Sequence, residues 1–363
     1  VVVMATEKER DLLAPCIEKG AKDYLMKPIN MGKLKDLGKY ITKVSDQVDQ
    51  AEGDVTYKKI RSLGTGASGT VDLVQRQSDL KMFALKTVDM GRLSDKERKM
   101  AKNEVNLLRV LNGPSIIQYY ESFEEKDVMK ILMEYAEHGS LDDLIKDCKS
   151  VGNIIPKDRI MQWTAHAVLG LLVMHSKNVL HRDIKAQNMF LASNMVVKLG
   201  DFGISKTLST NTSLAQTMIG TPYFMSPELI NEEPYGQKSD IWALGCTVYE
   251  LVTLKKPFDG KTSDQIFNKI KDNPYAPLGA DVDPDIKTLI DTLLQKDPKQ
   301  RPNIRKVANM PCLKSYIAEF LDTVPEYKES ISFAMNEMSL TEQKEESNVG
   351  SEETKGGSGK GGP

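Results

Sequence analysis

The sequence predicts an α+β protein of two lobes, a small β-rich lobe followed by a larger helical lobe. Two observations support this prediction. Short alternating or β-branched runs separated by turn residues occupy residues 57–133, whereas amphipathic helical patterns dominate residues 137–313. A third segment, residues 1–48, alternates between apolar runs and helical stretches, which predicts a separate α/β fragment ahead of the two lobes.

The β-rich lobe contains turn chemistry between its apolar runs, and its helix has a clear start. Ser94-Asp95-Lys96-Glu97 has the pattern of a capping box, which predicts a helix that runs to about Leu111. The expected elements of the two lobes are strands at 57–63, 70–76 and 81–88 and helices at 94–111, 158–175, 238–252 and 286–294.

Two polar stretches flank the lobes. Residues 49–56 are polar and predict a linker, and residues 314–363 predict a polar tail that is largely disordered. The end of that tail is rich in Glu, Lys, Ser and Gly, a composition that cannot bury enough apolar surface to offset its ordering entropy.

Composition bounds the class of protein. The net charge of −2 provides no basic field, so we expect neither nucleic acid nor a membrane surface as a main partner. The four cysteines form no CxxC pair, which favours reduced thiols in a cytoplasmic protein over a disulfide or zinc site. No apolar run approaches the roughly 20 residues that span a bilayer.

A glycine-rich run is the first candidate binding feature. It reads Gly64-Thr65-Gly66-Ala67-Ser68-Gly69, a GxGxxG spacing that lets backbone amides approach phosphate oxygens. Dinucleotide-binding folds share this spacing, and Asp89 stands about where their ribose-binding acid would be. That alternative needs a helix after the loop, whereas Thr70-Val71-Asp72-Leu73-Val74 is strand-like. We therefore expect a flap between two strands that covers phosphates.

Lys86 is the second candidate, at the end of the apolar run Phe83-Ala84-Leu85-Lys86. An ammonium in an apolar strand is costly unless it meets anions, so we expect Lys86 to contact phosphates. A lysine that extends from a strand end into solvent is the alternative. We expect Glu104, on the capped helix, to pair with Lys86; a surface pair with Arg98 or Lys102 is the alternative.

The strongest motif joins two runs. His181-Arg182-Asp183-Ile184-Lys185-Ala186-Gln187-Asn188 is followed thirteen residues later by Asp201-Phe202-Gly203. Phosphoryl transfer needs positioning and charge stabilisation, and these residue types supply both. Asp183 would orient the attacking hydroxyl, and Lys185 would neutralise the γ-phosphoryl group. Asn188 and Asp201 would offer a neutral and a charged oxygen to Mg²⁺.

Together these motifs resemble the signature set of eukaryotic protein kinases, over about residues 57–313. The resemblance implies a bilobal protein-kinase fold that binds ATP and Mg²⁺ between its lobes. It implies that Glu228 pairs with Arg301 and that Asp240 braces the backbone of the catalytic loop. The residues that it places around the adenine are Val71, Ala84, Met133, Glu134, Ala136 and Phe190.

The acceptor residue and its control also follow from this resemblance. Lys185 together with Thr221 resembles the pattern of serine/threonine kinases, and the protein substrates would carry Ser or Thr. Gln187 stands where kinases that prefer arginine upstream of the phosphosite often carry glutamate. We therefore expect substrates to have no strong need for basic residues before the phosphorylated Ser or Thr. Thr217 is the predicted activating phosphosite, because a phosphate there could pair with Arg182 and order the loop.

Two finer resemblances concern the kinase subgroup and the N-terminus. The runs HRDIKAQNMFL, KLGDFGIS, IGTPYFMSPEL and KSDIWALG are similar to those of NIMA-related (Nek) kinases, which implies cytoskeletal, centrosomal or ciliary partners. Residues 1–48 resemble the second half of a response-regulator receiver domain, with Lys27-Pro28 as its lysine–proline turn. An unrelated strand–helix extension is the alternative.

Two other functions compete with an active kinase. A kinase-fold scaffold would bind nucleotide and partners without turnover, but Lys86, Asp183 and Asp201 are all present. A phosphorelay receiver would need an acceptor aspartate with an acidic pocket, and residues 1–48 resemble only the half of the domain that lacks it.

Overall fold

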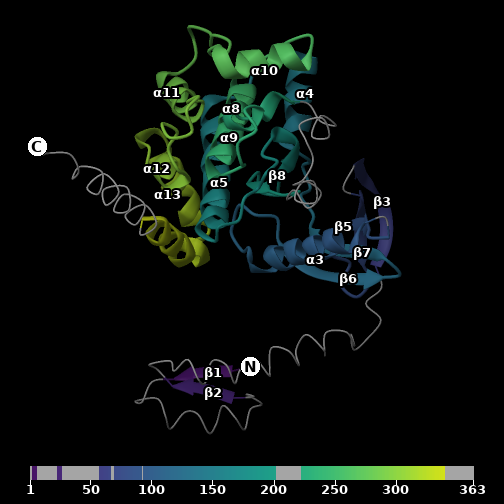
Figure 1. Ribbon diagram of the computed structural model, residues 1–363. Coiled ribbons are helices and arrows are strands. Elements are labelled where there is room, and N and C mark those ends of the chain that lie inside the picture. The colour runs from purple at the N-terminus through teal and green to yellow at the C-terminus, as the bar shows by residue number, and fades with distance from the viewer. Residues whose placement is uncertain are drawn as a thin grey trace, which may run out of the picture. The chain divides into compact units, whose positions relative to one another are not determined.

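The structure is a computed structural model that describes residues 2–5, 23–26, 57–66, 69–91, 93–201 and 222–339 (Figure 1). Among these residues no helix combines the length and the apolar character that crossing a membrane requires. The predicted linker at 49–56 lies outside the described residues.

The N-terminal segment contributes a pair of parallel strands. β1 (Val2–Ala5) pairs with β2 (Asp23–Met26), with Val2 opposite Asp23. Two of the apolar runs within residues 1–48 thus form strands. The helices predicted beside them lie outside the described residues, and the resemblance to a receiver domain stays a prediction.

The β-rich lobe is a five-stranded sheet with the order β3-β4-β5-β7-β6. Its strands are β3 (Tyr57–Gly66), β4 (Gly69–Arg76), β5 (Met82–Asp89), β6 (Tyr119–Glu125) and β7 (Val128–Glu134). β5 lies antiparallel between β4 and β7. A strand and not a helix follows the glycine-rich run, so its predicted place between two strands is confirmed and the dinucleotide-binding alternative is wrong, while its contact with phosphates stays a prediction.

One helix covers this sheet. α3 (Asp95–Val110) begins at a capping box in which Ser94 N donates to Glu97 Oε2 at 2.8 Å, so the predicted helix start is confirmed. Its buried stripe of Ala101, Val105 and Leu108 belongs to the hydrophobic core, with α3 packed against β6. α3 is therefore fixed to the sheet whose strand β5 carries Lys86.

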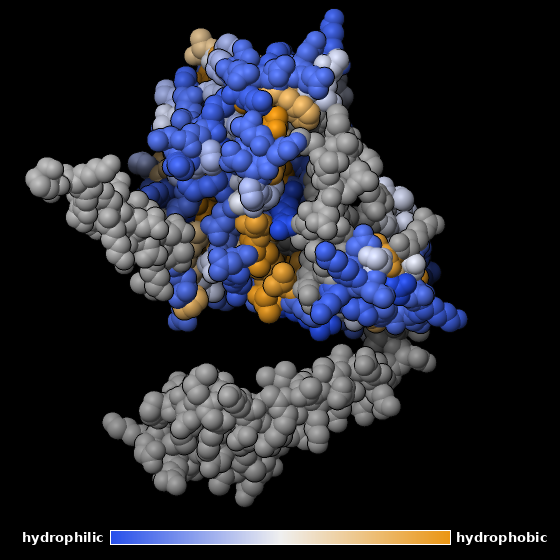
Figure 2. Space-filling model, in the orientation of Figure 1, coloured by the Kyte–Doolittle hydropathy of each residue, from blue (hydrophilic) through white to orange (hydrophobic). Residues whose placement is uncertain are grey.

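The helical lobe is built around two buried helices. α5 is buried continuously from Ile160 to His175 except at Gln162, and α9 from Ser239 to Leu251, as expected for helices with apolar residues on all sides. The other helices surround them, and the viewed face of this lobe is largely hydrophilic (Figure 2). The helices are α4 (Leu141–Val151), α5 (Lys157–Ser176), α8 (Pro227–Ile230), α9 (Gln237–Thr253), α10 (Ser263–Asp272), α11 (Pro284–Leu293), α12 (Ile304–Ala308) and α13 (Pro311–Thr323).

A short hairpin on α5 supports the catalytic motifs. β8 (Met189–Leu191) pairs antiparallel with β9 (Val197–Leu199), and the 3-10 turn η2 (Ala186–Asn188) leads into it. α5 fixes the hairpin through Val197 N, which donates to His166 Nδ1 at 3.1 Å. Since Asn188 precedes this hairpin and Asp201 follows it, its two strands bring the two motifs together.

The prediction of a disordered tail from residue 314 is wrong as far as residue 339. α13 continues to Thr323, the 3-10 turn η4 (Pro325–Tyr327) follows, and residues 328–339 are helical. The reason is apolar periodicity within a polar stretch: Ile331, Ala334 and Met338 share one face and are buried. Residues 340–363 lie outside the described residues.

This C-terminal helix gives a first prediction. Ile331 is 3% exposed and Phe333 is 65% exposed on the same helix. Replacing buried isoleucine by alanine costs about 2–5 kcal/mol, so Ile331→Ala should release the helix and speed amide exchange over residues 328–339. Hydrogen-exchange mass spectrometry measures this, with Phe333→Ala as the matched control that leaves exchange unchanged. Complete exchange of the helix within seconds in the unmodified protein would restore the prediction of a disordered tail.

Candidate active site

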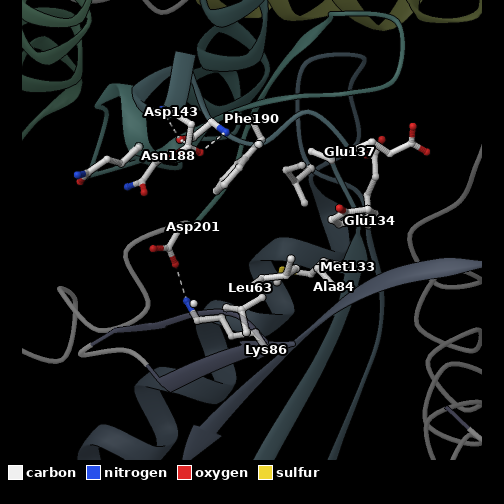
Figure 3. A pocket seen from close by; sticks show the side chains of 18 of the residues that line it. Leu63, Ala84, Lys86, Met133, Glu134, Glu137, Asp143, Asn188, Phe190 and Asp201 are labelled. Carbon is white, nitrogen blue, oxygen red and sulfur yellow. Dashed lines mark hydrogen bonds and ion pairs between the residues drawn. The ribbon is translucent and has the colours of Figure 1, made fainter. Parts of the chain in front are cut away.

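A cavity of about 510 Å³ lies between the sheet lobe and the helical lobe. Figure 3 shows Leu63, Ala84 and Lys86 on the sheet side of the cavity, with Asn188 and Phe190 on the opposite side. The segment after β7 closes a third side. The cavity therefore has an apolar roof and floor, with Lys86, Asn188 and Asp201 toward one end and Glu134 and Glu137 toward the other.

Most predicted binding residues line this cavity. The predicted residues in its wall are Gly64, Val71, Ala84, Lys86, Met133, Glu134, Ala136, Asn188, Phe190 and Asp201. Thr65 and Gly69 are described but do not line it, and nothing is described of the surroundings of residues 66–68. The structure thus joins the two lobes' motifs in one site.

Gly69 has a steric reason to be glycine. Its φ is +117°, and a Cβ at this position would stand 2.0 Å from the carbonyl oxygen of Thr87 on β5. This φ is unfavourable for an L-residue with a side chain, and the side chain would also collide with that oxygen. Gly69 is therefore needed where the flap returns to the sheet, which differs from the amide-to-phosphate approach expected from the sequence.

Lys86 lies at the end of the cavity that also contains Asn188 and Asp201. Its Nζ lies 2.5 Å from Oδ1 of Asp201, and the lysine side chain is only 4% exposed (Figure 3). The anion that a buried ammonium needs is thus supplied across the lobes by Asp201. A solvent-directed lysine, the alternative for Lys86, is wrong.

The structure does not test the predicted pairing of Glu104, on α3, with Lys86. Glu104 lies within the described helix, but its side chain lies outside the described ones, so its pairing stays a prediction. The alternative partners are engaged elsewhere: Arg98 pairs with Asp127 at 2.5 Å and Lys102 with Glu124 at 2.6 Å.

The catalytic loop forms a compact network around Asp183. Asn188 Nδ2 donates to Asp183 O at 2.8 Å and to Asp183 Oδ2 at 2.9 Å. Lys185 Nζ lies 3.0 Å from the same Oδ2. The carboxylate that would orient a hydroxyl is therefore held in place, and a lysine stands beside it to meet phosphoryl charge.

Asn188 and Asp201 suit a magnesium site. Because the amide nitrogen of Asn188 is used by Asp183, the amide oxygen remains as an acceptor for a cation. Asp201 adds a carboxylate that is 43% exposed. In the described part of the chain no group of three His, Cys, Asp or Glu side chains could hold a metal.

Asp240 braces the start of the catalytic loop, as predicted. Its wholly buried carboxylate accepts His181 N at Oδ2 and Arg182 N at Oδ1, both at 3.0 Å. His175 Nε2 lies 2.8 Å from Oδ2, and the hydroxyl of Tyr235 donates to Oδ1. Burial alone would raise the pKa of Asp240, but His175 and the other donors hold that pKa below its ordinary value.

The predicted pair of Glu228 with Arg301 is also confirmed. Arg301 Nη1 and Nη2 donate to the two carboxylate oxygens at 2.9 and 3.1 Å, and Ser239 donates to Oε1 at 2.8 Å. Burial acts to raise the pKa of Glu228, but Arg301 more than offsets it and the pKa is lowered. This pair fixes α8, the first helix after the segment 202–221, against α9.

Two residues at the rim of the cavity are not predicted by any motif above. Leu63 completes the apolar roof, and its position just before Gly64 at the end of an apolar run is the signal that indicates it. Asp143 forms a capping box with Ser140, whose hydrogen bonds lower the pKa of the Asp143 carboxyl. Its signal, Ser-x-x-Asp, predicts a helix start and gives no sign of a cavity.

An ion pair behind the cavity is also absent from the predictions. Lys198 on β9 lies 2.9 Å from Glu134 Oε2, and Gln118 N donates to the same oxygen at 3.1 Å. The side chain of Glu134 therefore connects the segment between the lobes to β9, the strand that precedes Asp201. The sequence places these residues 64 positions apart, so no local pattern predicts the contact.

The predicted regulatory residues are only partly described. Thr217 and Thr221 lie outside the described residues, together with the rest of 202–221. Arg182 adopts a φ of +67°, and its side chain forms no ion pair with any acid in the described part of the chain.

Two lobes share one cavity, with Lys86, Asn188 and Asp201 in its wall and Asp183 hydrogen-bonded to Asn188, and this arrangement defines the fold and site of a protein kinase. The comparisons with known proteins agree. A family model for the protein kinase domain matches residues 57–313.

Curated relatives identify the subgroup. Serine/threonine-protein kinase Nek5 of Homo sapiens is 40% identical over 73% of this chain and 37% of its own length. Probable serine/threonine-protein kinase nek3 of Dictyostelium discoideum is 41% identical over 72% of this chain and 24% of its own. Serine/threonine-protein kinase nekl-2 of Caenorhabditis elegans is 37% identical over 72% of this chain and 75% of its own.

The chain belongs to the protein kinase family, with Nek serine/threonine kinases among its relatives. The resemblance drawn from the catalytic runs is thereby confirmed. The chain spans only about a quarter to two-fifths of the length of the first relatives named.

The buried pair of Glu228 and Arg301 gives a second prediction. Glu228→Gln keeps the side chain's shape but leaves the guanidinium of Arg301, which is 0% exposed, without its counter-charge. Losing one partner of a buried pair costs about 3–5 kcal/mol, so the denaturant midpoint should fall clearly. Asp322→Asn, in the exposed pair with Lys328, is the matched control and should cost at most about 1 kcal/mol. Equal midpoints for both variants would contradict a stabilising role for the pair.

Proposed function

We propose that this protein is an active, ATP- and Mg²⁺-dependent serine/threonine kinase that transfers the γ-phosphoryl group of ATP to hydroxyls of protein substrates. The observation that carries the proposal is the network of Asp183, Lys185 and Asn188, held together at 2.8–3.0 Å and joined through Asn188 to the cavity that contains the Lys86–Asp201 pair. A scaffold that only bound nucleotide would not need this arrangement.

The chain's own residues account for most of the chemistry. Lys86 is positioned to bind phosphate oxygens at the buried end of the cavity, and the apolar roof and floor suit a planar base. Asp183 orients the attacking hydroxyl and receives its proton, while Lys185 offsets charge on the transferred group. Magnesium ions, when bound at Asn188 and Asp201, would neutralise phosphate charge.

The choice of serine or threonine rests on two supports. Lys185 and Thr221 match the serine/threonine pattern, and the relatives named above are serine/threonine kinases. Control by phosphorylation of Thr217 is part of the same proposal, since Arg182 offers a cation next to the catalytic aspartate. Cytoplasmic location and cytoskeletal or centrosomal substrates are proposed from the Nek resemblance alone.

A phosphotransfer assay tests the activity. With radiolabelled ATP, Mg²⁺ and a generic protein substrate, the unmodified chain should label Ser and Thr, and Asp183→Asn should lower the rate by about 100-fold or more because the hydroxyl loses its base. Asp147→Asn on the exposed face of α4 is the matched control and should keep the full rate. A labelling rate that is equal in Asp183→Asn and the unmodified chain would favour the scaffold.

Activation-loop control has its own test. Mass spectrometry after incubation with Mg-ATP should find phosphate on Thr217, and Thr217→Ala should lower activity about tenfold or more, because the ordered state loses its phosphate–arginine pair. Thr212→Ala, in the same loop, is the matched control. Full activity of Thr217→Ala would remove the regulatory part of the proposal and leave the kinase activity standing.

A further inference from the structure

The hydroxyl of Tyr235 makes the shortest hydrogen bond of the buried carboxylate that braces the catalytic loop. It donates to Asp240 Oδ1 at 2.6 Å, shorter than the bonds from His175, His181 and Arg182 to the same carboxylate. Burial and the charge of Asp240 raise the pKa of Tyr235 well above its ordinary value, so its hydroxyl keeps the proton that it donates.

The oxygen that Tyr235 contacts is the one that holds the backbone of Arg182. Oδ1 of Asp240 accepts Arg182 N at 3.0 Å, and Arg182 has a φ of +67°. A non-glycine residue keeps such a conformation only where its surroundings enforce it. Arg182 directly precedes Asp183, so a shift of Oδ1 would be transmitted to the catalytic carboxylate through one peptide unit.

Tyr235 itself is fixed from the other side. It lies in the loop between α8 and α9, and Gln237, the first residue of α9, donates to the carbonyl oxygen of His175 at 3.1 Å. The loop begins after the helix that carries Glu228, whose buried pair with Arg301 fixes it to the lobe. The tyrosine therefore links that anchor to the start of the catalytic loop.

We propose that Tyr235 is a positioning residue for phosphoryl transfer: its hydroxyl holds Oδ1 of Asp240, and through it the backbone of Arg182, so that Asp183 keeps its orientation in the cavity. This role rests on the proposed kinase activity. Tyr235 is not among the residues that line the cavity, so we expect its loss to affect the chemical step more than the binding of nucleotide or substrate.

Tyr235→Phe in the full 363-residue chain tests this role. Tyr249→Phe is the matched control, because Tyr249 is a buried tyrosine on α9 whose hydroxyl donates to Ala276 O at 3.0 Å, with no contact to the catalytic loop. Small misplacement of a reacting group costs up to about 100-fold. We expect the single-turnover rate at saturating ATP to fall about tenfold in Tyr235→Phe, with KM for ATP and substrate within about twofold, and to stay unchanged in Tyr249→Phe.

A double-mutant cycle with Asp240→Asn adds a second readout. If Tyr235 acts through Asp240, the tenfold effect should shrink to less than about twofold once that carboxylate is gone. A Tyr235→Phe variant with the rate of Tyr249→Phe, even with a lower melting temperature, would overturn the proposal, as would a full tenfold effect in the Asp240→Asn background. If the unmodified chain transfers no phosphate, the proposed function fails, and this outcome is distinct from equal rates of the two variants.

Discussion

The arrangement of the site depends on one buried charge, the carboxylate of Asp240. A carboxylate without exposure is tolerated only when hydrogen bonds and nearby cations replace its water. Four donors do this, and they come from α5, the catalytic loop and the loop before α9. Because each donor must reach the same two oxygens, satisfying the charge fixes three segments relative to one another.

The second buried carboxylate serves a neighbouring segment on the same principle. Glu228 is satisfied by Arg301 and by Ser239, and Ser239 directly precedes Asp240 on α9. α9 is thus the common support of both carboxylates, and its burial from Ser239 to Leu251 makes it a rigid one. α9 therefore holds the catalytic loop through Asp240 and holds α8 through Ser239 and Glu228. This explains why a mostly apolar helix carries polar residues at its start.

Sequence patterns predicted most of the fold and of the candidate site because their signals are local. The capping box at Ser94, the strand alternation after Gly69 and the runs around Asp183 and Asp201 each lie within a few residues. Contacts between distant residues gave no such signal. The pair of Lys198 and Glu134 depends on how two lobes meet, and Asp143 shows only a helix cap until the fold brings it to the cavity. The tail was mispredicted because its mean polarity hid the period of Ile331, Ala334 and Met338.

The acids that support the loop differ from the acid that faces the cavity in how many of their carboxylate lone pairs are already used by protein donors. Asp240 is 0% exposed and spends both oxygens on four protein donors, so it has no capacity left for a ligand. Asp201 is 43% exposed and receives one ion pair from Lys86, which leaves carboxylate capacity for a cation at the cavity. Asn188 shows the same division within one side chain, since its amide nitrogen holds Asp183 while its oxygen stays available. A kinase site of this kind needs both kinds of group. Acids whose oxygens are fully hydrogen-bonded hold the loop in place, and acids with free lone pairs can then bind metal and phosphate in a fixed geometry.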